Sequence, residues 1–174
     1  MALREVLKFP DPRLREISKP ILEINDEIRE LARSMCDLMY DEPGIGLAAP
    51  QVGVPLRLIV VDTKWTEGDV EREPLILINP ELTEHEGAII WKEGCLSVPD
   101  FESEVERSQK VRLVAQDLEG EEVVIDAEDL EAVCFQHEAD HLDGVLFIDR
   151  ISRLKRNLYV KRRKKQLKQE LEEA

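Results

Sequence analysis

Five residues, His137 to His141, constrain this chain most strongly, because they contain the pattern His-Glu-x-x-His. On an α-helix, residues four positions apart lie on one face, with their Cβ atoms about 5–6 Å apart. His137 and His141 would then bind one metal ion, and Glu138 would face whatever that ion binds, as a general base or acid. The pattern therefore predicts a helix that carries a catalytic metal site.

The flanking sequence supports a helix at this position. Asp126 is a candidate N-cap, acidic residues fill the first turn, and apolar residues follow at helical spacing. Gly144 comes directly after the last turn, as is common at the end of a helix. The alternative is that both imidazoles are ordinary surface or core side chains, but only three histidines occur in the chain and two lie in this motif.

The hydrophobic pattern around the motif predicts an α+β fold. A helix from Glu27 to about Tyr40, capped by Asn25 or Asp26, has one apolar face. The expected strands are residues 56–61, 75–78, 88–91, 111–115 and 123–125. Asn79-Pro80 is expected to end the second of them. Because the links are short and hairpin-like, we expect mostly antiparallel strands packed around a central metal-binding helix, with an N-terminal helix and a C-terminal helix.

A basic segment follows the predicted catalytic part of the chain. Residues 1–151 are expected to form a catalytic domain, and residues 152–174 a helix that is part of the same domain or a tail. This segment holds nine Lys or Arg residues between Arg153 and Lys168, although the net charge of the whole chain is −14. Leu154, Leu158 and Tyr159 are the candidates for packing it on the body. Its charged face is either simply solvated or binds nucleic acid.

The composition favours a cytoplasmic protein. No apolar run approaches the roughly 18 residues of a membrane span. Charges interrupt the first eight residues, so no signal-peptide core is expected. The three cysteines have no disulfide spacing, which fits a reducing compartment. Specific DNA binding is not expected from so acidic a body.

The third metal ligand has to come from another part of the chain. Catalytic sites usually have three protein ligands and one open position for water, and no histidine follows His141. Cys36 and Cys134 are expected to be core or pocket residues. Cys95 lies just after a predicted strand, between Gly94 and Pro99, in a turn that would aim its thiol. We therefore favour Cys95 as the ligand; the alternatives are a small buried residue or a nucleophile paired with a histidine.

The segment Gly44 to Gln51 is rich in small residues, which let a backbone approach a ligand closely. It is not a phosphate-binding loop, since no Gly-Lys-Ser/Thr follows. The Gln51 amide would suit a developing oxyanion. An ordinary connection between a helix and a strand explains the segment equally well.

Three separated segments, Gly44–Gln51, Glu93–Ser97 and Gln136–His141, resemble in order the three motifs of peptide deformylases. The resemblance runs from the Pro-Asp-Pro opening to about Ile151. It implies a metal-dependent amidohydrolase that removes the formyl group from N-formylmethionyl nascent peptides and releases formate. The metal ligands of the family fall on Cys95, His137 and His141.

The resemblance also implies roles for the other site residues. The catalytic glutamate of the family falls on Glu138, and its oxyanion-binding groups fall on the Gln51 side chain and the Leu96 backbone N–H. Gly46 matches the backbone that holds the formyl-methionine. The residues implied to line the methionine pocket are Ile45, Leu96, Leu130, Val133 and Cys134. Arg107 is inferred to pair with Glu93 beside the ligands.

The chain departs from the family pattern in one place. After Pro99, other members carry an Arg or a Tyr that touches the substrate, whereas this chain has Asp100-Phe101-Glu102. The substrate contacts on that side are therefore not implied by the resemblance.

Two questions stay open at this level. The first is the metal: the resemblance suggests Fe(II) as the native ion, while a Cys/His₂ site also suits Zn(II), Ni(II) or Co(II). The second is the activity, since the rival hypotheses are a metallopeptidase that cleaves internal peptide bonds and a catalytically silent member that only binds the ribosome. Some members contact ribosomal RNA through a C-terminal helix, which makes the ribosome a candidate partner.

Overall fold

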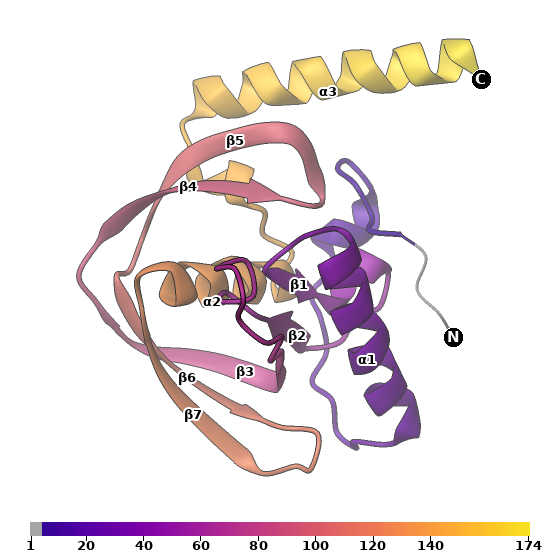
Figure 1. Ribbon diagram of the computed structural model, residues 1–174. Coiled ribbons are helices and arrows are strands. Elements are labelled where there is room, and N and C mark those ends of the chain that lie inside the picture. The colour runs from indigo at the N-terminus through magenta and orange to yellow at the C-terminus, as the bar shows by residue number, and fades with distance from the viewer. Residues whose placement is uncertain (1–4) are drawn as a thin grey trace.

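Three helices and seven strands make up the described part of the chain, residues 5–174 of a computed structural model (Figure 1). The opening charges that argue against a signal peptide begin in residues 1–4, outside the described residues. The helices and strands are α1 Asp26–Asp41, β1 Gly46–Ala48, β2 Leu58–Val61, β3 Leu75–Glu86, β4 Ile89–Cys95, β5 Val98–Arg107, β6 Lys110–Gln116, β7 Glu122–Glu128, α2 Asp129–Leu142 and α3 Arg153–Glu173. Three short 3₁₀ helices lie at η1 Pro12–Arg15, η2 Ala49–Val52 and η3 Phe147–Arg150.

The strands form two antiparallel sheets. Five of them pair in the order β1-β2-β3-β6-β7, and β4 and β5 form a separate hairpin. α2 lies between the hairpin and the larger sheet (Figure 1). The α+β class, the antiparallel strands and the central helix are therefore confirmed.

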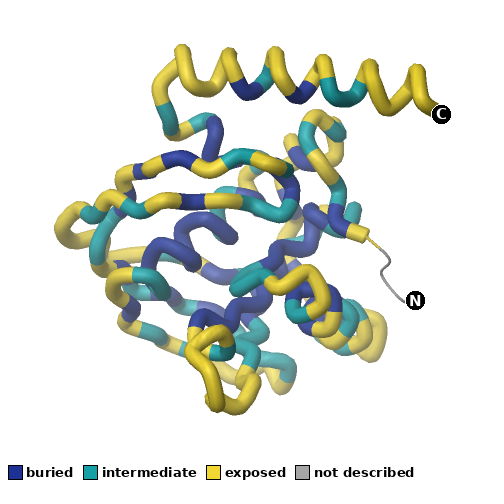
Figure 2. The backbone as a smooth tube through the Cα atoms, turned by 45° about the horizontal axis from the view of Figure 1, so that its top comes forward, coloured by how far each residue is buried: buried dark blue, intermediate teal, exposed yellow. Residues whose placement is uncertain are grey.

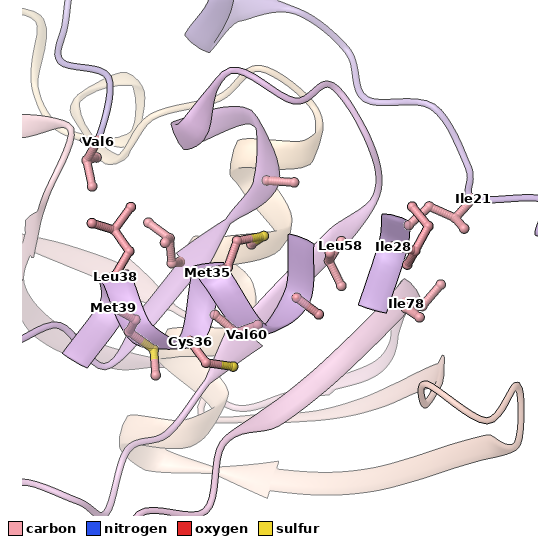
Figure 3. Packing of buried hydrophobic residues seen from close by; sticks show 13 residues of the cluster. Val6, Ile21, Ile28, Met35, Cys36, Leu38, Met39, Leu58, Val60 and Ile78 are labelled. Carbon is pink, nitrogen blue, oxygen red and sulfur yellow. The ribbon is translucent and has the colours of Figure 1, made fainter. Parts of the chain in front are cut away.

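β2 shows why the centre of the fold is apolar on both sides. Its four residues, Leu58–Val61, are all fully buried. Since side chains alternate along a strand, Leu58 and Val60 pack in the cluster of α1, whereas Ile59 and Val61 pack in the cluster of α2. Figure 3 shows the α1 side of this core. The first segment of the candidate site, at β1, is paired to this rigid strand.

The two predicted helix starts had different outcomes. Asn25 is the N-cap of α1, and its side chain accepts the Ile28 N–H at 3.0 Å, as predicted. The prediction that Asp126 is the N-cap of the metal-binding helix was wrong. It lies in β7 and accepts a hydrogen bond from Arg112 on β6 at 2.7 Å, so the strand continues and α2 begins only at Asp129.

Asn79-Pro80 does not end β3, contrary to the prediction. The backbone φ of Asn79 is 51°, and its side-chain amide forms two hydrogen bonds of 2.8 Å with the Ile21 backbone. The register shifts between Ile78 and Glu81, where β3 changes its partner from β2 to β6. The prediction failed because Asn79 forms a bulge in the strand instead of ending it. Its side chain satisfies the backbone hydrogen-bonding groups of Ile21, and the strand continues beyond the bulge.

Two further strand boundaries also differ from the prediction. The strand expected at 88–91 extends to Cys95, so that Cys95 ends β4. β5 was not predicted; acidic residues fill its exposed positions, while Val105 and other side chains of the opposite face are buried. The segment after Cys95 is therefore the turn of a β-hairpin.

α3 lies across the outside of the β4–β5 hairpin (Figure 1). The Ser152 side chain caps it by accepting the Lys155 N–H, and Tyr159 is buried with its ring 4.7 Å from that of Phe101. The expectation that Leu154 and Leu158 pack on the body was wrong, because they are 70% and 61% exposed. Figure 2 shows α3 as largely exposed and α2 as largely buried.

Among the described residues, no helix combines the length and the apolar character that crossing a membrane requires.

Candidate active site

The fold brings Cys95, His137 and His141 together. Their ligand atoms lie within 4.8 Å of one another, and the Cys95 Sγ is 3.4 Å from the His141 Nε2. The two histidines are one turn apart on α2, and Cys95 is delivered by the end of β4. Two elements that are separate in the sequence therefore build one candidate metal site.

The donor set fits a divalent transition-metal ion. One thiolate and two imidazoles leave a fourth tetrahedral position open, as in catalytic zinc sites. The Nδ1 of His137 is hydrogen-bonded to Glu93 Oε1 at 2.8 Å, which leaves its Nε2 free for the ion. Burial lowers the pKa of His141 well below its usual value, so this imidazole is neutral, as a ligand must be.

A buried chain of charges extends from His137 towards the surface. Arg107 donates two hydrogen bonds of 2.8 Å to Glu93 and one of 2.7 Å to Asp140, and Arg150 donates to both oxygens of Asp140. Burial would raise the pKa of Glu93, but the hydrogen bonds from Arg107 and His137 outweigh it and lower this pKa to about 2. Glu93 therefore stays anionic and orients His137. The inferred pairing of Arg107 with Glu93 is confirmed; Asp140 and Arg150 were missed, although Asp140 lies inside the motif.

His137 differs from His141 in its pKa. Burial alone would lower the pKa of His137, but its interactions with Cys95 and Glu93 and the nearby charge of Glu138 outweigh burial and raise it. The anionic groups around His137 thus favour positive charge at this point, which is where an ion would lie.

The Glu138 carboxylate lies beside the three ligand atoms. Its Oε1 is 4.0 Å from the His137 Nε2, while its Oε2 is buried and has no hydrogen-bond partner among the described residues. Burial raises the pKa of Glu138 to about 7. A buried oxygen without a partner in a polar site is placed to bind a water molecule or a substrate.

Gly46 lies against this carboxylate. A Cβ atom at this position would be 2.8 Å from Glu138 Oε1 and 2.9 Å from Cys134 Sγ. Only a residue without a side chain fits between β1 and α2 here, which explains the glycine in the first motif. The Cys134 thiol lies 3.7 Å from the Ile45 carbonyl oxygen, and burial raises its pKa, so it is a neutral thiol and not a ligand.

The Gln51 side chain is held rigidly at the site. Its Oε1 accepts the Ala48 N–H at 2.9 Å, and its Nε2 donates to Ser97 Oγ at 3.0 Å and lies 3.7 Å from Cys95 Sγ. The amide group is therefore directed at the cysteine. Ser97 was missed as a site residue, and nothing in the sequence beyond its proximity to Cys95 indicates this contact.

A cleft with a volume of about 890 Å³ opens onto these groups. Gly46, Gln51, Glu138 and two of the three candidate ligands line it. Every residue expected in the methionine pocket also lies on its wall: Ile45, Leu96, Leu130, Val133 and Cys134. Their shared location supports one continuous substrate site, and the apolar side chains give it a hydrophobic part.

The segment that departs from the family pattern forms one rim of this cleft. Glu102 on β5 lies 3.4 Å from the Lys92 ammonium group on β4, and both side chains are largely exposed. An acidic residue here is thus paired with a basic one, and the rim carries little net charge at this point.

Comparisons with known proteins agree with this geometry. The sequence profile of the family described as "Polypeptide deformylase" matches residues 3–157. A peptide deformylase of Afipia carboxidovorans is 52% identical over 163 residues, which cover 93% of this chain and 94% of that protein. The crystal structure of a peptide deformylase from Legionella pneumophila matches with a TM-score of 0.87 and 43% identity, covering 96% of this chain and 98% of the other.

A second solved structure, a peptide deformylase from Ehrlichia chaffeensis in complex with actinonin, has a TM-score of 0.88 and 34% identity over 95% of this chain and 98% of the other. Sequence relatives and solved structures thus agree over nearly the whole length. The chain belongs to the polypeptide deformylase family.

Proposed function

We propose that Cys95, His137 and His141 bind one divalent metal ion and that Glu138 uses this site to remove the formyl group from N-formylmethionyl nascent polypeptides. As a deformylase, the protein hydrolyses a formamide and releases formate and a free N-terminal amine. The observation that carries the proposal is the buried Glu138 carboxylate beside three clustered ligand atoms, since one of its oxygens has no hydrogen-bond partner in residues 5–174.

Glu138 carries the proton transfers of this reaction. When bound, the metal ion supplies Lewis acidity, which polarises a carbonyl group and lowers the pKa of water. Glu138 takes a proton from the attacking water molecule while the oxygen of that water forms a bond to the formyl carbon. It then gives a proton to the departing amine as the carbon–nitrogen bond breaks.

Gln51 and Leu96 stabilise the negative charge that develops on the formyl oxygen. The Gln51 amide is held near Cys95 because its Oε1 accepts the Ala48 N–H and its Nε2 donates to Ser97 Oγ, and the Leu96 backbone N–H follows Cys95 directly. One preorganised donor of this kind is worth roughly 3–4 kcal/mol in the transition state. Because these donors are fixed before the substrate arrives, little reorganisation is required.

The apolar part of the cleft selects the methionine side chain. Gly46 lets the substrate backbone approach Glu138, and the pocket formed by Ile45, Leu130, Val133 and other apolar residues receives the side chain. Burying a methionine side chain contributes about 1.5–3 kcal/mol.

Replacing Glu138 by alanine separates metal binding from chemistry. The Glu138→Ala variant should keep its metal, because none of the three ligands changes, and should lose most of its turnover of formyl-Met-Ala-Ser. Full activity in this variant would refute the role of Glu138. A peptide with an unformylated N-terminus, assayed in parallel for cleavage of its internal bonds, tests the metallopeptidase alternative. Turnover of formyl-Met-Ala-Ser by the unsubstituted protein tests the catalytically silent alternative.

Fe(II) is the native ion in our proposal, with Zn(II), Ni(II) and Co(II) as possible replacements in a Cys/His₂ site. Purification without oxygen, followed by metal analysis and formate release on the same sample, identifies the ion. A preparation that contains zinc alone and is fully active would overturn the iron assignment.

We further propose that residues 1–151 form the catalytic unit of a cytoplasmic enzyme and that α3 binds the ribosome. Lys161, Lys164 and Lys165 lie on the exposed part of this basic helix. Contacts between such side chains and phosphates weaken steeply with salt. Replacing all three by alanine should reduce co-sedimentation with ribosomes at low salt, and unchanged co-sedimentation would refute this role. Tyr159, which packs the helix on the body, stays in place in this variant.

A further inference from the structure

A second hollow adjoins the catalytic cleft at its rim. It has a volume of about 320 Å³ and lies between α3 and the rim of the cleft. Lys8, Pro99 and Asp100 line both this hollow and the catalytic cleft. The two spaces therefore meet at this rim, and we call the smaller one the α3 groove.

The outer wall of the α3 groove is fixed to the cleft rim. Arg162 donates a hydrogen bond of 2.6 Å to the Asp100 carbonyl oxygen, and Arg163, which is buried, donates one of 2.8 Å to the Phe9 carbonyl oxygen. The Arg162 guanidinium also lies 5.8 Å from the ring centre of Phe101. These contacts hold the helix in one position beside the cleft.

The wall contains a buried oxygen atom that lacks a hydrogen-bond partner among the described residues. Gln166 lines the α3 groove, and its Oε1 atom is buried without a hydrogen bond among the described residues. A buried acceptor without a donor costs free energy unless water or a ligand satisfies it. Gln166 is only partly buried as a residue, and a rotation of its side chain towards the α3 groove would bring this oxygen within reach of a peptide N–H.

The charges around the α3 groove are mixed. Lys8 and Arg163 are basic, whereas Asp100, Glu170 and Glu173 are acidic. This surface suits a peptide backbone with polar side chains, and it does not favour a strongly charged ligand of one sign.

We propose that the α3 groove binds the part of the formylated polypeptide that lies downstream of the first residues, so that α3 is the outer wall of an extended substrate site. This inference rests on the proposed function, because it requires the N-terminal residue to lie at Glu138. An extended chain advances about 3.3 Å per residue, so a chain that leaves the cleft over Pro99 and Asp100, which line both spaces, enters the α3 groove as it lengthens.

Peptide length tests this extended site. Formyl-Met-Ala-Ser is compared with the same peptide extended by four serines, in the metal-loaded full-length protein. The longer peptide should have a KM lower by about three- to tenfold, the equivalent of one hydrogen bond, with kcat unchanged. In Gln166→Ala this advantage disappears, whereas the kinetics of the tripeptide stay the same. Asn157→Ala, at an exposed position of α3 outside the groove, is the matched control and should keep the advantage.

Three results overturn the inference. The first is an equal KM for both peptides in the unsubstituted protein, and the second is an unchanged length advantage in Gln166→Ala. The third is an equal loss on both peptides in that variant, because Gln166 would then act through the fold. Deformylation of the tripeptide tests the proposed function separately, because Gln166 lines the α3 groove and not the catalytic cleft.

Discussion

Substitution of Gly46 by alanine tests whether the position of Glu138 limits the reaction. The added methyl group would lie 2.8 Å from Glu138 Oε1 and 2.9 Å from Cys134 Sγ. Neither β1 nor α2 can move apart easily at this point, because Gly46 is paired with Val61 in the sheet and both Glu138 and Cys134 are buried on α2. The φ angle of Gly46 is not in the left-handed region, so alanine fits the backbone and the conflict is purely one of space.

The magnitude follows from the distance. Ordinary contacts begin at 3.4 Å, so the Glu138 carboxylate has to move by about 0.6 Å. Misplacing a catalytic group by about 1 Å costs roughly a hundredfold in rate. We therefore expect kcat to fall about 10- to 100-fold, which corresponds to about 1.4–2.7 kcal/mol in the activation free energy. Overpacking should lower the free energy of unfolding by about 1–3 kcal/mol.

Steady-state kinetics with formyl-Met-Ala-Ser, metal analysis and denaturant unfolding measure these effects together. Gly94→Ala is the matched control, because Gly94 also lines the cleft and its Cβ would lie 3.4 Å from Glu102 Cγ, an ordinary contact. The reasoning is refuted if Gly46→Ala keeps kcat within twofold, or if Gly94→Ala loses as much. Loss of the metal from Gly46→Ala would also refute it, since no ligand is touched.

Three further predictions concern the surroundings of the site. Glu93→Gln should weaken metal affinity about 10- to 100-fold, because it weakens the hydrogen bond that orients His137; competition with a chromophoric chelator measures this, and an unchanged affinity would contradict it. Phe135→Ala should lower the free energy of unfolding by about 3–5 kcal/mol, because this side chain is fully buried between α2 and the larger sheet; a change below about 1 kcal/mol in denaturant titration would be inconsistent with that packing. Burial would raise the pKa of Asp149, but hydrogen bonds from Arg15 and from a backbone N–H outweigh burial and lower this pKa below 3.8. The ionised Asp149 therefore stabilises the fold at neutral pH, and this contribution is lost as the pH falls through the folded-state pKa. Asp149→Asn should therefore be less stable than the unsubstituted protein at pH 7, with a difference that narrows below about pH 4; a constant difference would argue against this linkage.

Local sequence signals were sufficient for several elements. The Asn25 cap and the apolar face of α1 depend on spacing within one helix, and both are found in the structure. Signals failed where a distant residue decided the outcome. Asn79 continues β3 because its side chain binds the Ile21 backbone, and Asp126 stays in a strand because it pairs with Arg112.

The candidate site shows the same division. Its ligands follow from motif spacing and from the family resemblance, and they meet within 4.8 Å. The contact of Gln51 with Ser97 and the ion-pair chain through Asp140 to Arg150 had no comparable signal. Each of these pairs joins groups whose proximity is set by packing between elements.

Periodicity and residue type were enough to predict the helix with its His-Glu-x-x-His pattern, the antiparallel α+β class, and the side chains available to bind a metal ion and to transfer a proton. These depend on periodicity and on the chemistry of single side chains. Three features of the site depend on how distant segments pack: Glu138 has an oxygen without a partner in the described part of the chain, Gly46 admits no side chain, and α3 lies beside the cleft. Such features arise from close packing between distant segments, where a few tenths of an ångström separate a contact from a clash.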